Sequence, residues 1–262
     1  MSQEQIKDLV RQQFGGTSAA YAVSATHRAG NDLDRLLELA DCRPDAEVLD
    51  IATGAGHTAR VLAPHVSHVV ISDLTPEMLD TARAEMQAAG VHNVSFRIAD
   101  AEELPFGGSV FDIVTCRIAP HHFSNCKMFT REVNRVLKPG GVFLLIDSTV
   151  PEEDELDKRL NELEWRRDHS HVRSFKRSEW ESMLQDAGLQ VEAAEEFPKR
   201  HIFADWTARS RMTDEDRVAL EKWLLESPRK FQERLSFEIE NGRLVAFSDQ
   251  KTLFKCRKPV MQ

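Results

Sequence analysis

A glycine-rich turn between a buried strand and a helix constrains this chain more than any other feature. The segment reads Val48-Leu-Asp-Ile-Ala-Thr-Gly-Ala-Gly-His-Thr-Ala59. The apolar run before the glycines is typical of a buried strand, and the spacing after them is typical of a helix. Gly54 and Gly56 allow a tight turn and a close approach of the backbone to a ligand at a helix N-terminus. This order of elements predicts an α/β fold that binds a nucleotide-like ligand at the turn.

Strand-like and helix-like segments alternate from residue 46 to about residue 147. The segments rich in branched apolar residues, which we expect to be strands, are 48–51, 69–71, 94–98, 111–116 and 142–146. Helices with apolar spacing are expected between them, at 58–64, 76–89 and 128–137. Pro76 suits a first helical position after a capping Thr75. The alternation predicts a doubly wound, mostly parallel, Rossmann-like sheet with helices on both faces, and we expect seven strands.

The rest of the chain is more charged and predicts helical lid elements beside the sheet. We expect helices at 152–167, 178–188 and 213–226, the second opened by a capping box at Ser178-Glu-Trp-Glu181. Strands are expected at 190–197, 235–239, 244–247 and 252–256, with Asn241-Gly242 as a hairpin turn. We therefore expect one domain over 1–262, with a helical cover at 1–44, a core at 45–147 and substrate-side helices and final strands at 148–262.

Composition disfavours several classes of protein. No run approaches the ~20 consecutive apolar residues that a membrane helix needs, and the polar start of the chain has no apolar signal-peptide core. The net charge of −9 disfavours a nucleic-acid-binding protein, which usually presents a basic face. The four cysteines are scattered, so neither a disulfide framework nor a zinc site is expected. We expect a cytoplasmic protein without a nucleic-acid or membrane partner; its oligomeric state stays open.

Three aspartates at the ends of predicted strands narrow the choice of ligand. Asp73 closes the second strand, where a carboxylate can accept both hydroxyls of an adenosine ribose. With the glycine turn alone, this pattern would fit a dinucleotide fingerprint equally well. Asp50 distinguishes a dinucleotide from a ligand that carries an ammonium group, because a buried carboxylate repels a pyrophosphate and attracts an ammonium group. Asp100 follows the third strand and can accept a hydrogen bond from an adenine amino group.

Each aspartate also has a purely structural explanation. Asp50 could cap the turn, Asp73 could be a helix N-cap, and Asp100 could open an Asx turn. The cofactor interpretation is preferred because the three occur together, each at its own strand end.

The chain resembles the class I S-adenosylmethionine (SAM)-dependent methyltransferases, most of all the branch around the ubiquinone/menaquinone C-methyltransferases. The resemblance covers residues 45–147 and rests on five segments in order: LDIATGAGHTA, ISDLTPEML, ADAEELPF, FDIVTCRIAPHHF and LKPGG. It implies SAM as the cofactor and a small molecule as the acceptor. The family's first glycine is Ala52 here, which is expected to reduce the room beside the methionine part of SAM without abolishing binding.

The resemblance also implies which residues contact each part of SAM. The methionine part would contact Ala52, Gly54 and Gly56, and the ribose would contact Asp73. The adenine would contact Leu74, Asp100 and the backbone of Ala101. The sulfonium would lie near the backbone of Arg117. Related enzymes cover the cofactor with an N-terminal segment. Tyr21 is therefore predicted to contact SAM or the acceptor, and anchoring of that segment in the core is the alternative.

Two histidine clusters are candidates for the acceptor side. His121 and His122 follow the fourth predicted strand, and an imidazole with a pKa near ~6.5 can accept a proton at neutral pH. Either is a candidate general base, with His121 slightly preferred, and packing or capping at a helix start is the alternative. His169, His171 and Arg173 are expected either to contact the acceptor or to shape a loop. No metal is expected, because His169 and His171 do not share a helical face and no third ligand is evident.

These observations together predict SAM-dependent methyl transfer to carbon or oxygen of a small molecule. An aromatic or quinol-like acceptor follows from the resemblance alone. The alternatives are a SAM-binding protein without transferase activity and an NAD-dependent oxidoreductase. An oxygen or an activated aromatic carbon would need a base, whereas a neutral amine or thiol would need less help.

Overall fold

The computed structural model describes residues 1–16 and 31–260 of the 262-residue chain. The helices are α1 (Gln3–Gly15), α4 (Asn31–Leu39), α5 (His57–Leu62), η1 (Ala63–His65), α6 (Pro76–Ala88), η2 (Pro120–His122), α7 (Cys126–Val136), α8 (Asp154–Arg167), α9 (Arg177–Asp186), α10 (Phe203–Arg209), α11 (Asp214–Leu225) and α12 (Arg229–Arg234). The strands are β1 (Glu47–Ile51), β2 (His68–Asp73), β3 (Val94–Ile98), β4 (Phe111–Arg117), β5 (Leu137–Val150), β6 (Phe175–Lys176), β7 (Gln190–Ile202), β8 (Glu238–Glu240) and β9 (Arg243–Arg257). Among these helices, none combines the length and the apolar character that crossing a membrane would require.

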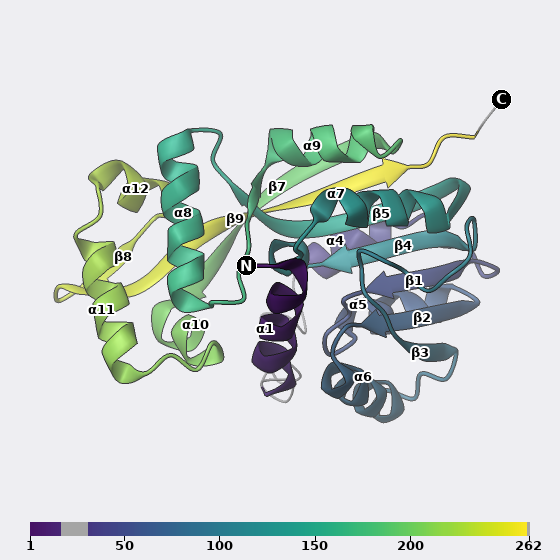
Figure 1. Cartoon of the computed structure of the whole chain (residues 1–262), viewed down its shortest axis with the longest axis horizontal. Helices are drawn as coiled ribbons and strands as arrows, with labels where there is room; N and C mark the ends of the chain where they lie inside the picture. Colours follow the sequence, from purple (N-terminus) through teal and green to yellow (C-terminus); the bar gives the residue numbers. More distant parts are fainter. Residues whose placement is uncertain (17–30, 261–262) are drawn as a thin grey trace.

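Within the described residues, nine strands form one sheet (Figure 1). Seven of these described strands follow the order β3-β2-β1-β4-β5-β9-β7, while β6 pairs with β5 and β8 pairs with β9. Strands β1 to β5 run parallel to one another, and β9 is antiparallel to both β5 and β7. The strand order reverses between β1 and β4, which is where open α/β sheets form a crevice at the strands' carboxyl ends. The doubly wound, mostly parallel, Rossmann-like sheet is therefore confirmed.

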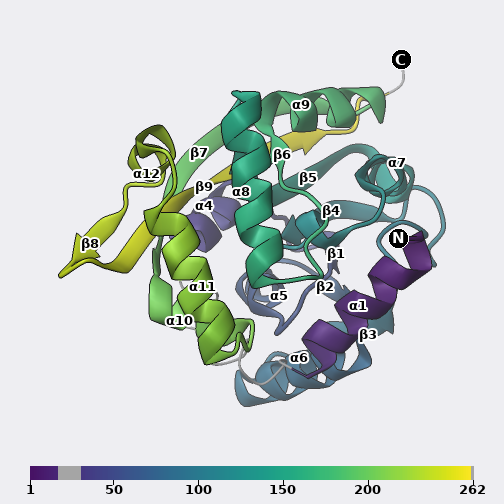
Figure 2. The same ribbon diagram turned by 60° about the vertical axis from the view of Figure 1, so that its left-hand side comes forward.

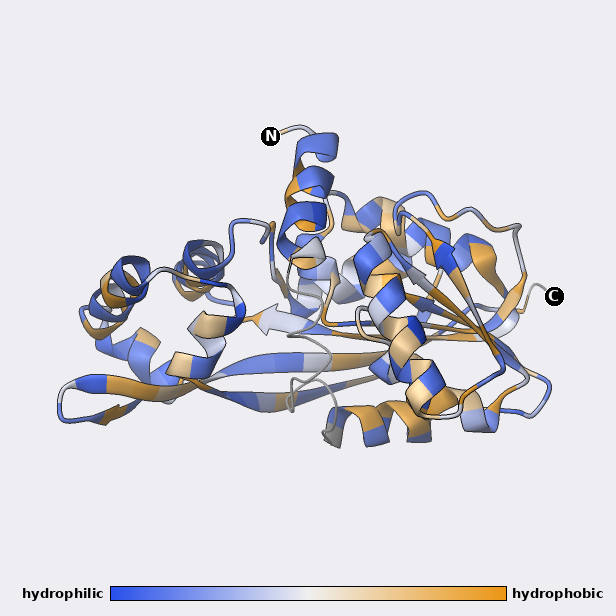
Figure 3. Ribbon diagram, turned by 90° about the horizontal axis from the view of Figure 1, so that it is seen from below, coloured by the Kyte–Doolittle hydropathy of each residue, from blue (hydrophilic) through white to orange (hydrophobic). Residues whose placement is uncertain are grey.

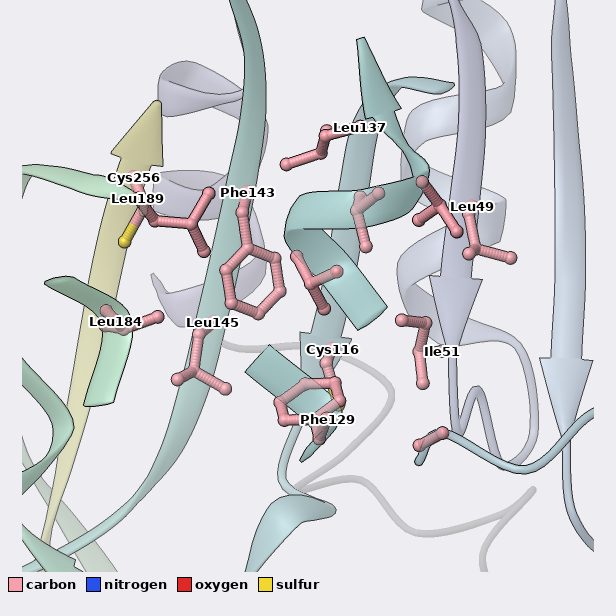
Figure 4. Packing of buried hydrophobic residues seen from close by; sticks show 14 of the residues in the cluster. Leu49, Ile51, Cys116, Phe129, Leu137, Phe143, Leu145, Leu184, Leu189 and Cys256 are labelled. Carbon is pink, nitrogen blue, oxygen red and sulfur yellow. The ribbon is translucent and has the colours of Figure 1, made fainter. Parts of the chain in front are cut away.

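Helices cover both faces of the sheet. Helices α7 and α9 lie over one face, where Leu49, Phe129, Phe143 and Leu184 belong to one buried cluster (Figure 4). Helices α4, α5 and α6 lie over the other face, and Val48 belongs to the cluster there. Consecutive residues of β1 thus enter different clusters, because side chains alternate along a strand. A strand buried on both faces is what the apolar run of β1 predicted.

Strands β7 and β9 continue beyond the parallel strands as a two-stranded extension (Figures 1 and 2). Helices α8, α10, α11 and α12 pack on it around a third buried cluster, which includes Leu160, Trp206, Leu224 and Phe247. Figure 3 shows the long strands reaching from the main sheet beneath these helices. We call the four helices, β8, residues 198–202 of β7 and residues 243–251 of β9 the ribbon lobe.

The ribbon lobe is where the sequence predictions fail most. The strands expected at 244–247 and 252–256 are one continuous strand, β9, so their separation is wrong. The strand expected to end at Phe197 continues to Ile202 through Pro198. Pro198 is tolerated because β7 is an edge strand that bonds only to β9. Helices α10 and α12 were not predicted, and Leu235 is the C-cap of α12 instead of the first residue of a strand.

The capping box expected at Ser178 is also wrong. Helix α9 begins one residue earlier, at Arg177, and the Glu179 carboxylate accepts the backbone N–H of Lys176 at 2.9 Å. The Ser178 hydroxyl instead donates to Glu152 Oε2 at 2.6 Å. The predicted glutamate of the box, Glu181, instead accepts a hydrogen bond from Arg177 Nε at 2.8 Å, and Glu179 takes its role for an N-cap two residues upstream of Ser178.

Candidate functional site

A cavity runs from the carboxyl ends of β1, β2 and β4 to the ribbon lobe. Its loop end is lined by the glycine turn and the residues that follow β2 and β3, including Ala52, Gly54, Asp73, Leu74, Asp100 and Ala101. Its ribbon end is lined by residues of η2, α8, α10, β7 and β9. The structure thus brings most of the predicted cofactor contacts to one end and the predicted base to the other.

Backbone geometry explains the glycine turn. Ala52, Gly54 and Gly56 all have left-handed φ angles, of +51°, +56° and +82°. A Cβ on Gly56 would lie 3.1 Å from Met86 Cε and 3.3 Å from Ala82 Cβ, so close packing against α6 favours glycine there. Gly56 is not among the described cavity-lining residues, whereas Gly54 is. Ala52 adopts the left-handed region at a cost of ~1–2 kcal/mol, so the family's glycine has a conformational reason at this position as well as a steric one.

Asp50 lies in the wall of the loop end and is 1% exposed. Its carboxylate accepts hydrogen bonds from the hydroxyls of Thr53 and Thr115, the latter at 2.7 Å. The register of β1 and β4 places Asp50 directly beside Thr115. Burial raises the pKa of Asp50 to about 6, even though both hydroxyls favour its charged form. The Arg117 guanidinium also favours the charged form, and a buried carboxylate attracts a cationic ligand and repels a phosphate.

Asp73 ends β2 and joins two loops. Its Oδ2 accepts the backbone N–H of Gly54 at 3.0 Å, and its Oδ1 accepts that of Thr75 at 2.9 Å. Burial raises the pKa of Asp73 to about 6. Thr75 is the N-cap of α6 and Pro76 is its first residue, as expected, although the Thr75 side chain makes no capping hydrogen bond with the helix. Asp73 therefore fixes the glycine turn to the start of α6 while it lines the cavity.

Asp100 is paired with a cation that the sequence did not reveal. Lys7 Nζ lies 2.5 Å from Asp100 Oδ2 and 3.3 Å from Glu102 Oε2. Asp100 Oδ1 also accepts the N–H of Glu102 at 2.9 Å, which is the Asx turn weighed as the structural alternative. Helix α1 lies beside α6 and carries Lys7, Val10 and Phe14 to the cavity, although none of its residues is buried (Figure 2). A lysine in a polar N-terminal helix gives no sequence signal of a partner so far along the chain.

The end of β4 is held by an ion pair and by a strained residue. The guanidinium of Arg117 lies 2.6 Å from Asp32 Oδ2, with both side chains buried, which ties β4 to α4. Ile118 follows with a φ of +54°, unusual for a β-branched residue, and its N–H donates to the carbonyl of Ile146 at 2.7 Å. Both Arg117 and Ile118 line the cavity. Strain of this kind concentrates at functional sites, and here it lies where β4 meets the cavity.

A histidine–aspartate pair begins the ribbon end. His121 Nδ1 lies 2.6 Å from Asp147 Oδ1, and both residues are buried. An aspartate on one ring nitrogen orients the imidazole and leaves the other nitrogen to accept a proton, as a general base requires. The sequence analysis missed Asp147. The signal was present, because Asp147 follows the apolar run of β5 as Asp73 follows that of β2.

His122 and His171 surround His121. Their ring centroids lie 4.3 and 5.7 Å from that of His121. The carbonyl of Ser170 is 3.0 Å from His122 Nδ1, and burial and then His121 lower the pKa of His122 to about 4. His171 Nε2 is 2.9 Å from Asn161 Oδ1, and burial followed by the neighbouring histidines lowers its pKa to about 2. Both rings are therefore neutral at neutral pH, and the weak basicity of His122 favours His121 as the base.

Other predicted acceptor-side residues lie elsewhere. His169 is exposed and packs edge-on against Trp165, with ring centroids 4.7 Å apart. Arg173 binds one carboxylate of α8 at 3.0 Å and one of α9 at 2.9 Å, so it fastens these helices together. Neither residue is among those that line the cavity. Tyr21 lies outside the described residues. The predicted acceptor contacts of these residues gain no support from their positions.

Four polar residues of β7 and β9 line the ribbon end, and the sequence analysis missed them: Lys199, His201, Asp249 and Lys251. Lys199 pairs with Asp249 across the antiparallel strands, so alternate residues share one face. Lys251 Nζ donates to Asp249 Oδ2 at 2.6 Å and to Ser148 Oγ at 2.7 Å, and His201 Nε2 lies 3.0 Å from Asp249 Oδ1. Although burial alone would raise it, the pKa of Asp249 is held well below its usual range by His201 and Lys251.

Comparison with known proteins shows extensive similarity to methyltransferases. Residues 48–141 match a family described as a methyltransferase domain. The uncharacterized methyltransferase YcgJ of Bacillus subtilis is 40% identical over 196 residues, which cover 75% of this chain and 78% of the relative. The crystal structure of a candidate methyltransferase from Bacillus halodurans has a TM-score of 0.86 and 42% identity, with 88% of this chain and 100% of that chain covered. The ubiquinone/menaquinone biosynthesis C-methyltransferase UbiE of Shewanella baltica is 36% identical over 126 residues, 47% of this chain and 50% of the relative.

Proposed function

Because the chain belongs to the class I SAM-dependent methyltransferases, we propose that it methylates an oxygen or carbon atom of a small-molecule acceptor. In this proposal His121 is the general base and Asp147 orients it. The observation that carries the proposal is the hydrogen bond between His121 Nδ1 and Asp147, because it lies at the cavity that the glycine turn also lines.

The chemistry of the loop end suits SAM. SAM carries a sulfonium, an amino group and two ribose hydroxyls. We assign Asp50 to the positively charged methionine part and Asp73 to the ribose hydroxyls, with Leu74, Asp100 and Ala101 around the adenine. A cation near Asp50 would offset the burial that raises its pKa. A dinucleotide would instead bring its pyrophosphate towards the same carboxylate, which argues against the NAD alternative.

The residues at the ribbon end supply base catalysis. When bound, SAM would supply an electrophilic methyl group: an acceptor atom would bond to the methyl carbon from the side opposite the sulfur, the carbon–sulfur bond would break, and SAH would be the leaving group. His121 would accept the proton that an acceptor hydroxyl loses near the transition state, which typically contributes ~10²–10⁴-fold to the rate. Asp147 would keep the other proton on Nδ1 and stabilise the imidazolium. Positioning of the reactants and exclusion of water by α1 and the ribbon lobe would contribute up to ~7–11 kcal/mol.

An aromatic acceptor fits the lining of the cavity. Phe14, Phe123 and Trp206 all contribute to it, and Phe14 packs edge-on against His122 with ring centroids 4.9 Å apart. Aromatic walls favour a flat ring by offset and edge-on packing. The UbiE relatives, which are named for quinone biosynthesis, support the same class of acceptor for this chain.

The test uses labelled SAM and a small-molecule extract, because the acceptor itself is not identified. The wild-type protein should transfer label to compounds that carry a phenolic hydroxyl or an activated ring carbon. His121→Ala should lower kcat by ~100-fold or more and leave the Kd for S-adenosylhomocysteine (SAH) within twofold, with partial rescue by added imidazole.

His169→Ala, at an exposed histidine outside the described cavity lining, is the matched control and should keep wild-type activity. Transfer only to amines or thiols would contradict the proposal. So would His121→Ala activity within threefold of the wild type, because the base would then be unnecessary.

A further inference from the structure

We propose that the acceptor carries an anionic group, a carboxylate or a phosphate ester, which binds to the face of β7 and β9 that presents Lys199, His201 and Lys251. We call this set of side chains the cationic face. The inference rests on the proposed function, since it names the class of acceptor for the same cavity.

The charge of the ribbon end is opposite to that of the protein. The chain has a net charge of −9. Among the described side chains that line the ribbon end, four cations face two carboxylates: Lys199, Lys251, Arg167 and Arg209 against Glu164 and Asp249. Two of the cations are paired with these carboxylates, Arg167 with Glu164 and Lys251 with Asp249, and the lining keeps an excess of positive charge, which raises the local concentration of anionic ligands.

Burial gives the cationic face a second feature that points to a ligand. Lys251 is 5% exposed and His201 is 8% exposed. An ammonium group has three N–H donors, and hydrogen bonds to Asp249 and Ser148 use two of those on Lys251. His201 Nδ1 is buried and has no hydrogen-bond partner. Buried polar groups normally have partners, so polar atoms of a ligand would complete this face.

The cationic face adjoins the proposed base. Ser148 accepts a hydrogen bond from Lys251 and follows Asp147 directly in β5, and the register of β5 and β9 pairs Ser148 with Lys251. Asp147 and Ser148 are successive residues of β5 and point to opposite faces of the sheet, but His121 and Lys251 both line the same cavity. A small acceptor can bind Lys251 through its anionic group while it presents a hydroxyl or a ring carbon to His121. An anion there would also offset the burial that lowers the pKa of Lys199.

The first measurement is calorimetry on the SAH-saturated protein with two probes of equal ring size, 4-hydroxybenzoate and its neutral methyl ester. The anion should bind at least ~10-fold more tightly than the ester, a difference of ~1.4 kcal/mol. The preference should fall to within twofold in Lys251→Gln and in the Lys199→Gln/Lys251→Gln double variant. It should persist in Lys251→Arg, which keeps the charge, and in Lys222→Gln, an exposed lysine of the same lobe.

Unchanged SAH affinity in each variant shows that the fold and the loop end are intact. Equal binding of acid and ester, or a preference that survives in the double variant, would overturn the inference. This readout needs no turnover, so it fails or succeeds independently of the base assigned to His121.

A second measurement covers an acceptor unlike either probe. The small-molecule extract is separated on an anion-exchange resin before it is incubated with the enzyme and labelled SAM. Labelled products from the retained, anionic compounds support the inference. If that fraction gives no labelled product, the inference is overturned. Labelled products from the unretained compounds alone would overturn the inference and still show that the protein is a methyltransferase.

Discussion

The loop end of the cavity presents Asp50, Asp73 and Asp100, whereas the ribbon end presents Lys199, Lys251 and Arg167. Apart from α1 and the end of β4, the loop end comes from turns within residues 50–102, at the carboxyl ends of the parallel strands β1, β2 and β3. The ribbon end is assembled from η2, β5, α8, β7 and β9, which span residues 120–257. The two walls differ in charge, as the proposed cofactor and the proposed acceptor do, and the loop end is the more local of the two in sequence.

The largest expected effect separates catalysis from cofactor binding. Asp147→Asn should lower kcat by ~100-fold or more, because the asparagine neither orients His121 as an acceptor nor stabilises its charged form. The Kd for SAH should stay within twofold, as measured by calorimetry beside steady-state rates. Asp112→Asn, at the opposite end of the parallel strands where Asp112 binds Lys138, is the control. A comparable loss of SAH affinity in Asp147→Asn would mean that the two ends are not separable.

The converse substitution is at the loop end. Asp73→Asn should raise the Kd for SAH by ~10-fold, or ~1.4 kcal/mol. The amide cannot accept hydrogen bonds on both sides, so it loses either the Gly54 contact or the ribose. Calorimetry should show the 4-hydroxybenzoate affinity changed by less than twofold. If the anion affinity fell in parallel, the comparison between the two ends would break.

The pH dependence of binding should come from the loop end. The pKa values of Asp50 and Asp73 are raised by burial to about 6, so both carboxyl groups become protonated as the pH falls through that value. Loss of their charge should weaken SAM binding by ~3- to 10-fold between pH 7 and pH 5. Titration of SAM from pH 5 to pH 8 should show a midpoint near 6, with a flatter profile in Asp50→Asn. His122 and His171, with pKa values of about 4 and 2, do not titrate in this range. A flat wild-type profile would contradict the expectation.

The smallest effect concerns the strained turn. Ala52→Gly should raise the free energy of unfolding by ~0.5–1 kcal/mol, because relief of the left-handed φ outweighs the greater entropy of the unfolded chain. Urea denaturation measures the change, and the SAH affinity should change by less than twofold. Destabilisation would show that the methyl group of Ala52 contributes packing greater than the strain that it causes.

The sequence was sufficient for the half-sheet and its loops because each signal there is local. A strand end, a glycine and an aspartate fall within a few residues of one another, so Asp50 and Asp73 could be placed before their neighbours were known. Asp147 could have been found by the same argument. Lys7 could not, because its partner Asp100 lies far along the chain.

The ribbon lobe could not be predicted in this way. In its long strands, side chains such as His201 and Lys251 face a cavity, so the apolar alternation that identifies a half-buried strand is interrupted by polar residues. Pro198 also suggested that the strand ends at Phe197, although β7 continues through it to Ile202. The sequence therefore suggested two short strands with a gap where the structure has one continuous β9.

The continuity of β9 has a consequence for how such enzymes diversify. Side chains alternate along a strand, so inserting one residue between Lys251 and Leu253 would turn either the lysine or the core leucine to the wrong face. Inserting two residues would leave the side chains of Lys251 and Leu253 pointing as they do now and would move the lysine by ~7 Å along the strand. Insertions and deletions in this part of β9 should therefore occur two residues at a time. Relatives of this chain would then bind acceptors whose lengths differ by discrete steps.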